Sequence, residues 1–253
     1  MQNETMGVPI VHPVALQILE AEDLSQKTFL EFGTVIENPA PSLIPSLEIS
    51  SLPPNAVQAN QGSALKYQDV THMVDLYGSA PSHEPAKAVM NMFVCAPRPL
   101  LSSQQVGIAG NFPVKVLERH PFTTQTFIPL GLSPSEAYKA RYLVIVAPSL
   151  PPSSSSSGLP VPGHTDTSDR SRGNGLPDLE NIRAFVANGA QAVTYGVGTW
   201  HAPMVVIGRI PIDFVVVQFA NGVAIEDCQE RELGEEREIL VAVTKPHRRW
   251  WKL

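Results

Sequence analysis

Three short stretches of this 253-residue chain hold polar side chains of the kinds that transfer protons, bind carboxylates or coordinate metals. Taken singly, each stretch has an ordinary structural explanation: an acid and a histidine on a solvent-facing strand, a packed tryptophan–histidine pair, or a solvated lysine on a loop. Together they favour a common site. The candidate residues are Glu118, His120 and Gln125 in "LERHPFTTQ"; Tyr195, Trp200 and His201 in "TYGVGTWHAP"; and Asn60 and Lys66 in "NQGSALKYQDV".

The spacing within two of these stretches is similar to the metal-ligand patterns of small cupin barrels. One such pattern is His-x-His followed by an acid, and the other is Pro-x-Gly-x-x-His on a later strand. Glu118-x-His120 with Gln125 resembles the first pattern, and "GVGTWH" resembles the second. Residues two apart share one face of a strand. We therefore expect Glu118 and His120 to face one pocket, with His201 brought across from them by a closed barrel.

Two of the expected ligand types are changed in this pocket. A glutamate stands in place of a histidine, and a glutamine stands in place of the acid. These changes weaken a tight transition-metal site, so no cofactor is required by the sequence. A divalent metal such as nickel, if one binds, would be held by His120, His201, Glu118 and Gln125.

The elements that position these side chains are expected to be many short strands. The chain contains 24 prolines and 17 glycines, and the segments between them are rich in Val, Ile, Phe and Tyr. Continuous apolar runs such as 214–217 indicate burial on both faces. The pattern predicts a mainly β fold, an antiparallel sandwich or barrel with a few short helices. The expected strands span 89–95, 112–118, 124–130, 141–147, 184–188, 191–196, 203–210, 213–220 and 237–243.

Two short helices and one insertion are expected beside the strands. Ser25 can cap a helix that Gly33 ends in the left-handed conformation, and Asp178 can cap a helix of one or two turns. The low-complexity segment at about 149–177 includes five consecutive serines from Ser153. Such a segment cannot bury enough apolar surface to offset its ordering entropy. We expect a mobile loop that interrupts a single domain of residues 1–253, rather than a linker between two domains.

Composition argues against several classes of protein. The net charge of −6 argues against a nucleic-acid partner, and no run approaches the ~20 apolar residues of a membrane span. Cys95 and Cys228 form neither a secreted disulfide framework nor a zinc pattern, which predicts an intracellular, cytoplasmic protein. The C-terminal "WKL" is similar to the peroxisomal Ser-Lys-Leu address, but Trp251 stands where that signal needs a small residue.

At the level of whole motifs, the chain resembles the ureidoglycolate lyases of allantoin catabolism, formerly called ureidoglycolate hydrolases. The shared blocks follow the family's order and cover nearly all of the chain outside the serine-rich insertion and the tail. The insertion is similar to that of fungal members. The blocks are "FLEFGTVIE", "NQGSALKYQDV", "LERHPFTTQTFIPLG", "PDLENIRAFVANGAQAVTYGVGTWHAP" and "DFVVVQF".

The resemblance implies a cupin-like double-stranded β-helix barrel, a homodimer, and cleavage of ureidoglycolate to glyoxylate and urea. Bacterial members are associated with a divalent metal such as nickel. This chain departs from the bacterial pattern: Lys66 replaces a common arginine, and Gln68 replaces a common histidine. Gly196 and Ala202 stand where histidines flank the Trp-His pair. Fewer imidazoles argue further against a firm metal site.

The reaction implied by the resemblance gives each candidate a role. His120 and His201 are expected to be the acid and the base, because imidazole titrates near neutral pH, and the sequence does not say which is which. Glu118 could orient His120, act as a base or hold a metal. Lys66 would bind the substrate carboxylate. Asn60, Gln125 and Tyr195 would bind the urea end, and Trp200 would exclude water.

Two other functions remain open at this stage. One is an amidohydrolase that acts on ureidoglycolate and releases ammonia. The other is a cupin-like barrel that binds a small acid without turnover. The products distinguish the first from the lyase, and the absence of glyoxylate distinguishes the second.

Overall fold

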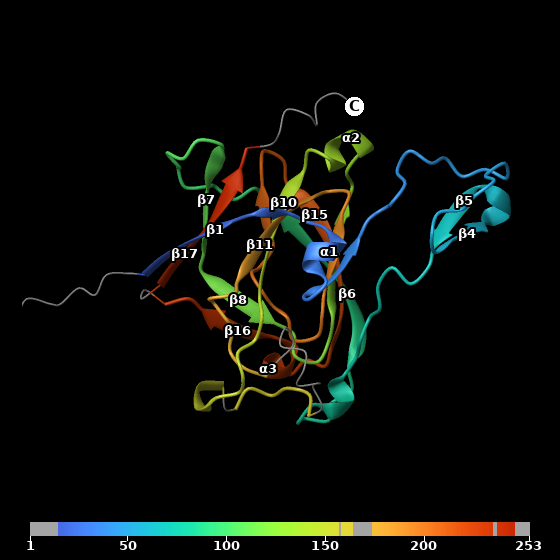
Figure 1. Cartoon of the computed structure of the whole chain (residues 1–253). Helices are drawn as coiled ribbons and strands as arrows, with labels where there is room; N and C mark the ends of the chain where they lie inside the picture. Colours follow the sequence, from blue (N-terminus) through green and yellow to red (C-terminus); the bar gives the residue numbers. More distant parts are fainter. Residues whose placement is uncertain (1–14, 157, 164–173, 235–236, 246–253) are drawn as a thin grey trace, which may run out of the picture.

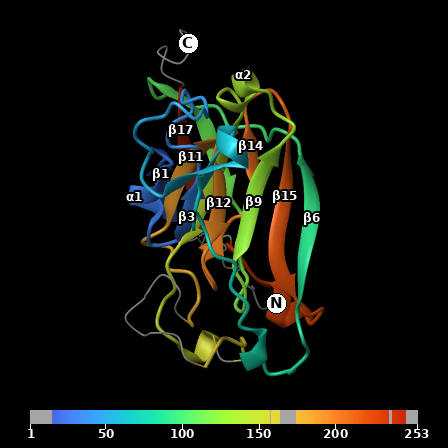
Figure 2. The same cartoon turned by 90° about the vertical axis from the view of Figure 1, so that its right-hand side faces the viewer.

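The computed structural model describes residues 15–156, 158–163, 174–234 and 237–245. Among these residues the chain is mainly β, and the three α-helices are single turns: α1 (Gln26–Phe29), α2 (Pro134–Ala137) and α3 (Ala224–Asp227). The strands form a barrel-like stack of sheets (Figures 1 and 2), which confirms the predicted mainly β, cupin-like fold. No helix in the described part of the chain is long and apolar enough to cross a membrane.

Two larger sheets build the walls that face each other around the candidate site. The seven-stranded sheet contains β16 (Gln229–Glu232), β8 (Val116–Arg119), β13 (Trp200–His201), β10 (Arg141–Ala147), β11 (Arg183–Asn188) and β2 (Glu22–Asp23), in that order, with β14 (Val205–Ile207) also paired to β10. The five-stranded sheet contains β3 (Gly33–Ile36), β12 (Ala192–Tyr195), β9 (Gln125–Leu130), β15 (Ile212–Ala220) and β6 (Lys87–Cys95).

Two smaller sheets complete the strands. The three-stranded sheet contains β1 (Ala15–Glu20), β17 (Arg237–Thr244) and β7 (Ile108–Val114), and the two-stranded sheet contains β4 (Ala56–Ala59) and β5 (Ala64–Tyr67). Short 3₁₀ turns lie at η1 (Asn60–Gly62), η2 (Tyr77–Ser79) and η3 (Ser154–Ser156).

Strand β10, in the middle of the seven-stranded sheet, is buried on both faces. On one face of β10, Leu143 and Ile145 join a core shared with the three-stranded sheet; on the other face, Val144 and Val146 join a core shared with the five-stranded sheet. The continuous run of β10 is thus explained by its two buried faces. The prediction of such burial for 214–217 is wrong, because β15 alternates buried Phe214 and Val216 with half-buried neighbours.

The serine-rich insertion leaves and re-enters a single hairpin. Its flanking strands β10 and β11 pair antiparallel, from Arg141 opposite Asn188 to Val146 opposite Arg183. Its described ends are also held against the barrel: the Pro160 carbonyl accepts a hydrogen bond from Gln229 Nε2 at 2.7 Å. Residues 164–173, which include His164, and the tail 246–253 lie outside the described residues.

The helix expected after Ser25 begins where predicted but does not end where predicted. Ser25 caps α1 as predicted, since its Oγ accepts a hydrogen bond from the Thr28 N–H. Gly33 does not end that helix but opens β3, at φ 153°. A Cβ there would lie 1.9 Å from the Thr194 carbonyl oxygen, so the close approach of β12 explains the glycine.

Two further predictions are corrected by the sheet connections. Residues 178–182 form a turn, in which the Asp178 carboxylate accepts hydrogen bonds from Glu180 N–H and from the Asn181 side chain, instead of capping a helix. The expected strand 112–118 is split into β7 and β8, because the chain passes from the three-stranded to the seven-stranded sheet at Lys115.

The β4–β5 hairpin with η1, residues 56–67, stands apart from the barrel and is called the arm below. Its two strands pair only with each other. Figure 1 shows the arm projecting from the side of the molecule that carries β6, near the α2 end of the barrel. The sequence pattern did not predict this hairpin, because its strands are short and largely exposed.

Candidate active site

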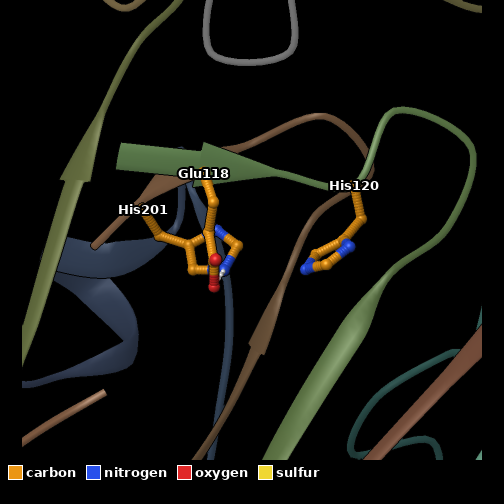
Figure 3. Close-up of side chains that lie close together, drawn as sticks. All are labelled: Glu118, His120 and His201. Carbon is orange, nitrogen blue, oxygen red and sulfur yellow. Dashed lines mark ion pairs between the residues drawn. The ribbon is translucent and has the colours of Figure 1, made fainter. Parts of the chain in front are cut away.

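Two cross-strand pairs in facing sheets build the centre of the site. Glu118 on β8 lies directly opposite His201 on β13, and Gln125 on β9 lies directly opposite Tyr195 on β12. His120 follows the end of β8. Figure 3 shows Glu118, His120 and His201 close together, with the two imidazoles directed toward a common space. The expectation that distant segments bring these residues together is met by the strand register.

The ring nitrogens of His201 both face hydrogen-bond acceptors. Nδ1 lies 2.9 Å from the Thr199 carbonyl oxygen. Nε2 lies 3.2 Å from Gln125 Oε1 and 3.6 Å from a carboxylate oxygen of Glu118. Each ring nitrogen of His201 therefore faces an oxygen that accepts hydrogen bonds.

His120 has the opposite surroundings. Its Nδ1 lies 2.6 Å from the carbonyl oxygen of Asp227, the last residue of α3. Since a carbonyl oxygen only accepts, the proton resides on Nδ1 and leaves a lone pair on Nε2. That Nε2 is buried and has no hydrogen-bond partner among the described residues. Burial, followed by the charge of His201, lowers the pKa of His120 to about 4, so the ring is neutral near pH 7.

The Glu118 carboxylate is held as an anion by its histidine neighbours. Burial alone would raise the pKa of this carboxyl, but the hydrogen bond and charge of His201, together with the charge of His120, leave the pKa below its ordinary value. The ring centroids of His120 and His201 are 5.6 Å apart. The site thus combines one carboxylate, one imidazole that faces acceptors at both nitrogens and one neutral imidazole.

Tyr195 forms the wall behind His201. Its phenol ring stacks on the imidazole with centroids 3.9 Å apart and an angle of 11° between the planes. The ring is buried, and its hydroxyl has no hydrogen-bond partner among the described residues. An unpaired buried hydroxyl is costly unless a ligand satisfies it.

Gln218 on β15 is a member of the site that the sequence reasoning missed. Its Oε1 accepts a hydrogen bond from Gln125 Nε2 at 2.6 Å, which leaves the oxygen of the Gln125 amide facing His201. A single glutamine within the apolar run "DFVVVQFA" was the available signal. The carbonyls of Thr199 and Asp227 also act here, and as backbone groups they leave no signal in the side-chain pattern.

Three of these side chains could hold a metal ion. The donor atoms of Glu118, His120 and His201 all lie within 4.8 Å of one another, and Gln125 Oε1 lies beside them. The Asp227 carbonyl orients the His120 ring in the way that outer partners orient metal-binding histidines. The set of two imidazoles and a carboxylate fits a divalent ion such as nickel.

Trp200 lies on the opposite face of the seven-stranded sheet from His201. It is fully buried in the core shared with the three-stranded sheet. The Arg119 guanidinium lies 4.6 Å from the centre of its ring, and its Nε1 donates to the Gly175 carbonyl at 3.2 Å. Arg119 Nη1 donates to the same carbonyl at 3.0 Å. Trp200 therefore anchors the returning end of the insertion and is not brought to the imidazoles.

Asn60 and Lys66 are likewise not brought to the imidazoles within one chain. Both are exposed on the arm, Asn60 at its tip in η1 and Lys66 on β5. Neither has a recorded contact with Glu118, His120 or His201. Of the predicted site residues, the structure gathers five: Glu118, His120, Gln125, Tyr195 and His201.

Comparison with known proteins adds to this geometry. A family model described as "Ureidoglycolate lyase" matches residues 16–240. The chain is 33% identical over 224 residues to a ureidoglycolate lyase of Schizosaccharomyces pombe, covering 88% of this chain and 96% of that protein. It is 37% identical over 220 residues to one of Saccharomyces cerevisiae, covering 85% and 92%. A ureidoglycolate lyase of Burkholderia mallei is 29% identical over 202 residues, covering 80% and 82%.

Proposed function

This chain belongs to the ureidoglycolate lyase family, and we propose that it cleaves ureidoglycolate into glyoxylate and urea, with His120 as the base and His201 as the acid. The observation that carries the proposal is the opposite hydrogen bonding of the two imidazoles. One presents an unpaired lone pair, and the other faces acceptors at both nitrogens.

The reaction requires one proton to be removed and one to be supplied. Ureidoglycolate carries a hydroxyl, a carboxylate and a urea nitrogen on one carbon. His120 Nε2 takes the hydroxyl proton while the carbon–oxygen double bond of glyoxylate forms. The carbon–nitrogen bond breaks, its electron pair stays on nitrogen, and His201 Nε2–H protonates that nitrogen to release urea. Each transfer typically contributes ~10²–10⁴-fold.

Glu118 serves His201 in this scheme. Its carboxylate oxygen lies 3.6 Å from His201 Nε2, so its negative charge stabilises the imidazolium that donates the proton. Orienting His120 was one of three roles that the sequence left open for Glu118, and the Asp227 carbonyl is the group that contacts the His120 ring. Gln125 and the unpaired Tyr195 hydroxyl are the groups placed to receive the urea end.

A divalent ion would use the same donors in a different protonation state. Bound by Glu118, His120 and His201, it would supply Lewis-acid polarisation of the substrate oxygens. His201 Nε2 would have to be deprotonated to bind it, which is incompatible with His201 as the acid. Chelator-treated protein is therefore expected to keep its turnover. Loss of turnover on chelation, with recovery on adding nickel, would replace the metal-free scheme.

We further propose that the protein is a cytoplasmic homodimer. Cys95 and Cys228 are both free thiols, which agrees with a reducing compartment. The outer face of the five-stranded sheet supports the homodimer and is described in the next subsection.

The test of the proposed function measures both products with purified protein. Wild type is expected to convert ureidoglycolate into glyoxylate and urea in equal amounts, without ammonia. The His120→Ala and His201→Ala variants should each lose at least about 10²-fold in kcat while their circular dichroism stays that of wild type. His72→Ala, at an exposed histidine, is the matched control. Ammonia release, or near-wild-type rates in both site variants, would overturn the proposal.

A further inference from the structure

We propose that the arm of each subunit reaches across a two-fold dimer and places Lys66 in the partner's active site. The inference rests on the proposed function, because it assigns the group that binds the substrate carboxylate. It starts from a gap in the site. Among the described residues, the hydrogen-bond and ion-pair partners of Glu118, His120 and His201 include no lysine or arginine side chain.

Arg119 does not fill this gap, although it lies between Glu118 and His120 in sequence. Its guanidinium lies over Trp200 and donates to Gln229 Oε1 and to the Gly175 carbonyl on the far side of the sheet. A substrate carboxylate beside Glu118 would be a second negative charge, and the proposed His201 imidazolium can balance only one of the two. The missing cation has to come from elsewhere.

Lys66 is a cation without a charge partner in its own subunit, as far as the described residues show. It is exposed on β5 and makes no hydrogen bond or ion pair with another described residue. The next residue, Tyr67, borders a pocket with Ile36, Ile128 and Pro129 at the outer surface of the five-stranded sheet. Gln125 and Tyr195 line the site from the inner face of the same sheet. The base of the arm is thus separated by that sheet from the site of its own chain.

Segment 71–74 lies across part of the outer face of the five-stranded sheet, where Thr71 Oγ1 donates to Thr194 Oγ1 and Thr126 Oγ1 lies 3.4 Å from Met73 Sδ. Away from this segment, the outer face carries apolar side chains whose exposed fractions lie between 39% and 76%. A contiguous apolar face of this kind marks an interaction site in a soluble protein. The edge of β6 is also unpaired along its nine residues, and exposed hydrophobic edges are normally covered. The exposed residues are Met90, Met92, Val94, Ile128 and Leu130.

The arm lies on the same side of the molecule as this face (Figures 1 and 2). A two-stranded hairpin is only marginally stable by itself in water, and the arm and the segment before it expose further apolar side chains, Ile44, Leu47 and Val57. The arm has no core of its own, and part of the outer face of the five-stranded sheet is apolar and exposed. The two surfaces are therefore complementary. A second copy of this chain supplies both at once, since a two-fold interface uses the same surfaces of each subunit.

A two-fold arrangement would also bring the arm of each subunit to the active site of the other. Figure 1 places the arm near the α2 end of the barrel. His120 follows β8 and bonds to the end of α3, at the opposite end of the barrel. When two subunits pack antiparallel through the outer sheet face, the arm of each comes to the α3 end of the other. Lys66 would then come to the partner's active site, together with Asn60.

A heterodimer experiment tests this placement. The Lys66→Ala and His201→Ala chains are coexpressed with different tags, and the mixed dimer is isolated by two affinity steps. With Lys66 acting across the dimer, each homodimer is impaired but the mixed dimer has one intact site, so it should show about half of the wild-type turnover per dimer. With Lys66 acting in its own chain, both sites of the mixed dimer are damaged, and its kcat/KM should not exceed that of the Lys66→Ala homodimer.

A second pairing gives the reverse outcome and serves as the matched control. A mixed dimer of wild type with the Lys66→Ala/His201→Ala double variant should be impaired at both sites if Lys66 acts across the dimer, because each site then lacks one residue. It should keep about half of the wild-type kcat/KM if Lys66 acts in its own chain, whereas with Lys66 acting across the dimer its kcat/KM should not exceed that of the Lys66→Ala homodimer.

Separate readouts tell this inference apart from the proposed function. Glyoxylate and urea release by wild type tests the function. With an active wild type, three results would overturn the inference. They are a monomer in light scattering, a fully active Lys66→Ala homodimer, and a mixed dimer of one Lys66→Ala chain with one His201→Ala chain that is no more active than the Lys66→Ala homodimer. Lys66→Ala should raise KM at least about tenfold, since it removes a charged hydrogen bond to the carboxylate, and Lys66→Arg should restore most of the loss.

Discussion

His201 lies flat on the ring of Tyr195, with centroids 3.9 Å apart and planes 11° from parallel. The contact joins the two facing sheets, since His201 is on β13 and Tyr195 is on β12. A phenol face is favourable for an imidazolium, because the ring quadrupole attracts a cation. The stack therefore suits the role of proton donor that is proposed for His201.

The Tyr195 hydroxyl provides a prediction that separates stability from function. It is buried without a partner in the free protein, so Tyr195→Phe should raise the free energy of unfolding by about 1 kcal/mol. The same variant keeps the stack on His201 but loses a hydrogen bond to substrate, so KM should rise about tenfold. Urea denaturation and steady-state kinetics measure the two effects. A less stable variant with unchanged KM would show that the hydroxyl is structural.

Gln218 is predicted to be a positioning residue that acts through Gln125. Gln218→Leu removes the acceptor of Gln125 Nε2 and frees the amide to turn away from His201. Its kcat should fall about tenfold with little change in KM, which corresponds to roughly one hydrogen bond. Gln218→Glu keeps an acceptor and should stay within about threefold of wild type.

A double-mutant cycle checks that Gln218 works through Gln125 and not through packing. The Gln125→Leu/Gln218→Leu variant should be no slower than Gln125→Leu alone, because the second change then has nothing left to orient. Additive losses in kcat would assign Gln218 an independent role.

The order of the strands could be predicted from the sequence more accurately than the face of the sheet on which each residue lies. The expected strand 141–147 coincides with β10, and the alternation rule placed Glu118 and His120 together correctly. The same rule excludes Trp200 from a site that contains its strand neighbour His201, just as it excludes Arg119 beside Glu118. Trp200 was nevertheless expected in the site, because the Trp-His block resembles the family motif.

Other features depend on contacts that no local pattern contains. β13 has two residues, and it exists because His201 pairs with Glu118 on one side while it pairs with Val146 on the other. The assignment of acid and base needed the carbonyls of Thr199 and Asp227, whose positions follow from tertiary structure alone. The sequence could therefore name the imidazoles, but it could not distinguish their protonation states.

The lowered pKa of His120 predicts a loss of stability in acid. The pKa is 6.5 in the unfolded chain and about 4 in the folded protein, so between these values the unfolded state binds the extra proton. Stability is therefore fully present above pH 6.5 and falls as the pH drops toward 4, by about 1.4 kcal/mol per pH unit.

The measurement uses chelator-treated protein unfolded by urea at several pH values. Between pH 6.5 and 5, wild type should lose about 2 kcal/mol more than His120→Gln, because glutamine does not titrate. This window lies above the range in which most carboxylates titrate. Parallel curves for the two proteins would mean that His120 titrates normally in the fold.

Trp200 is predicted to stabilise the fold without binding substrate. Trp200→Phe removes the hydrogen bond to the Gly175 carbonyl and weakens the contact with the Arg119 guanidinium, which together should cost about 1–3 kcal/mol of stability. KM for ureidoglycolate should stay within about twofold of wild type, because a contact that is absent from the site contributes nothing to substrate binding. Denaturation curves and initial rates, both recorded well below the melting temperature, test the two statements. A stable variant with a strongly raised KM would return Trp200 to the substrate pocket that the family motif suggested.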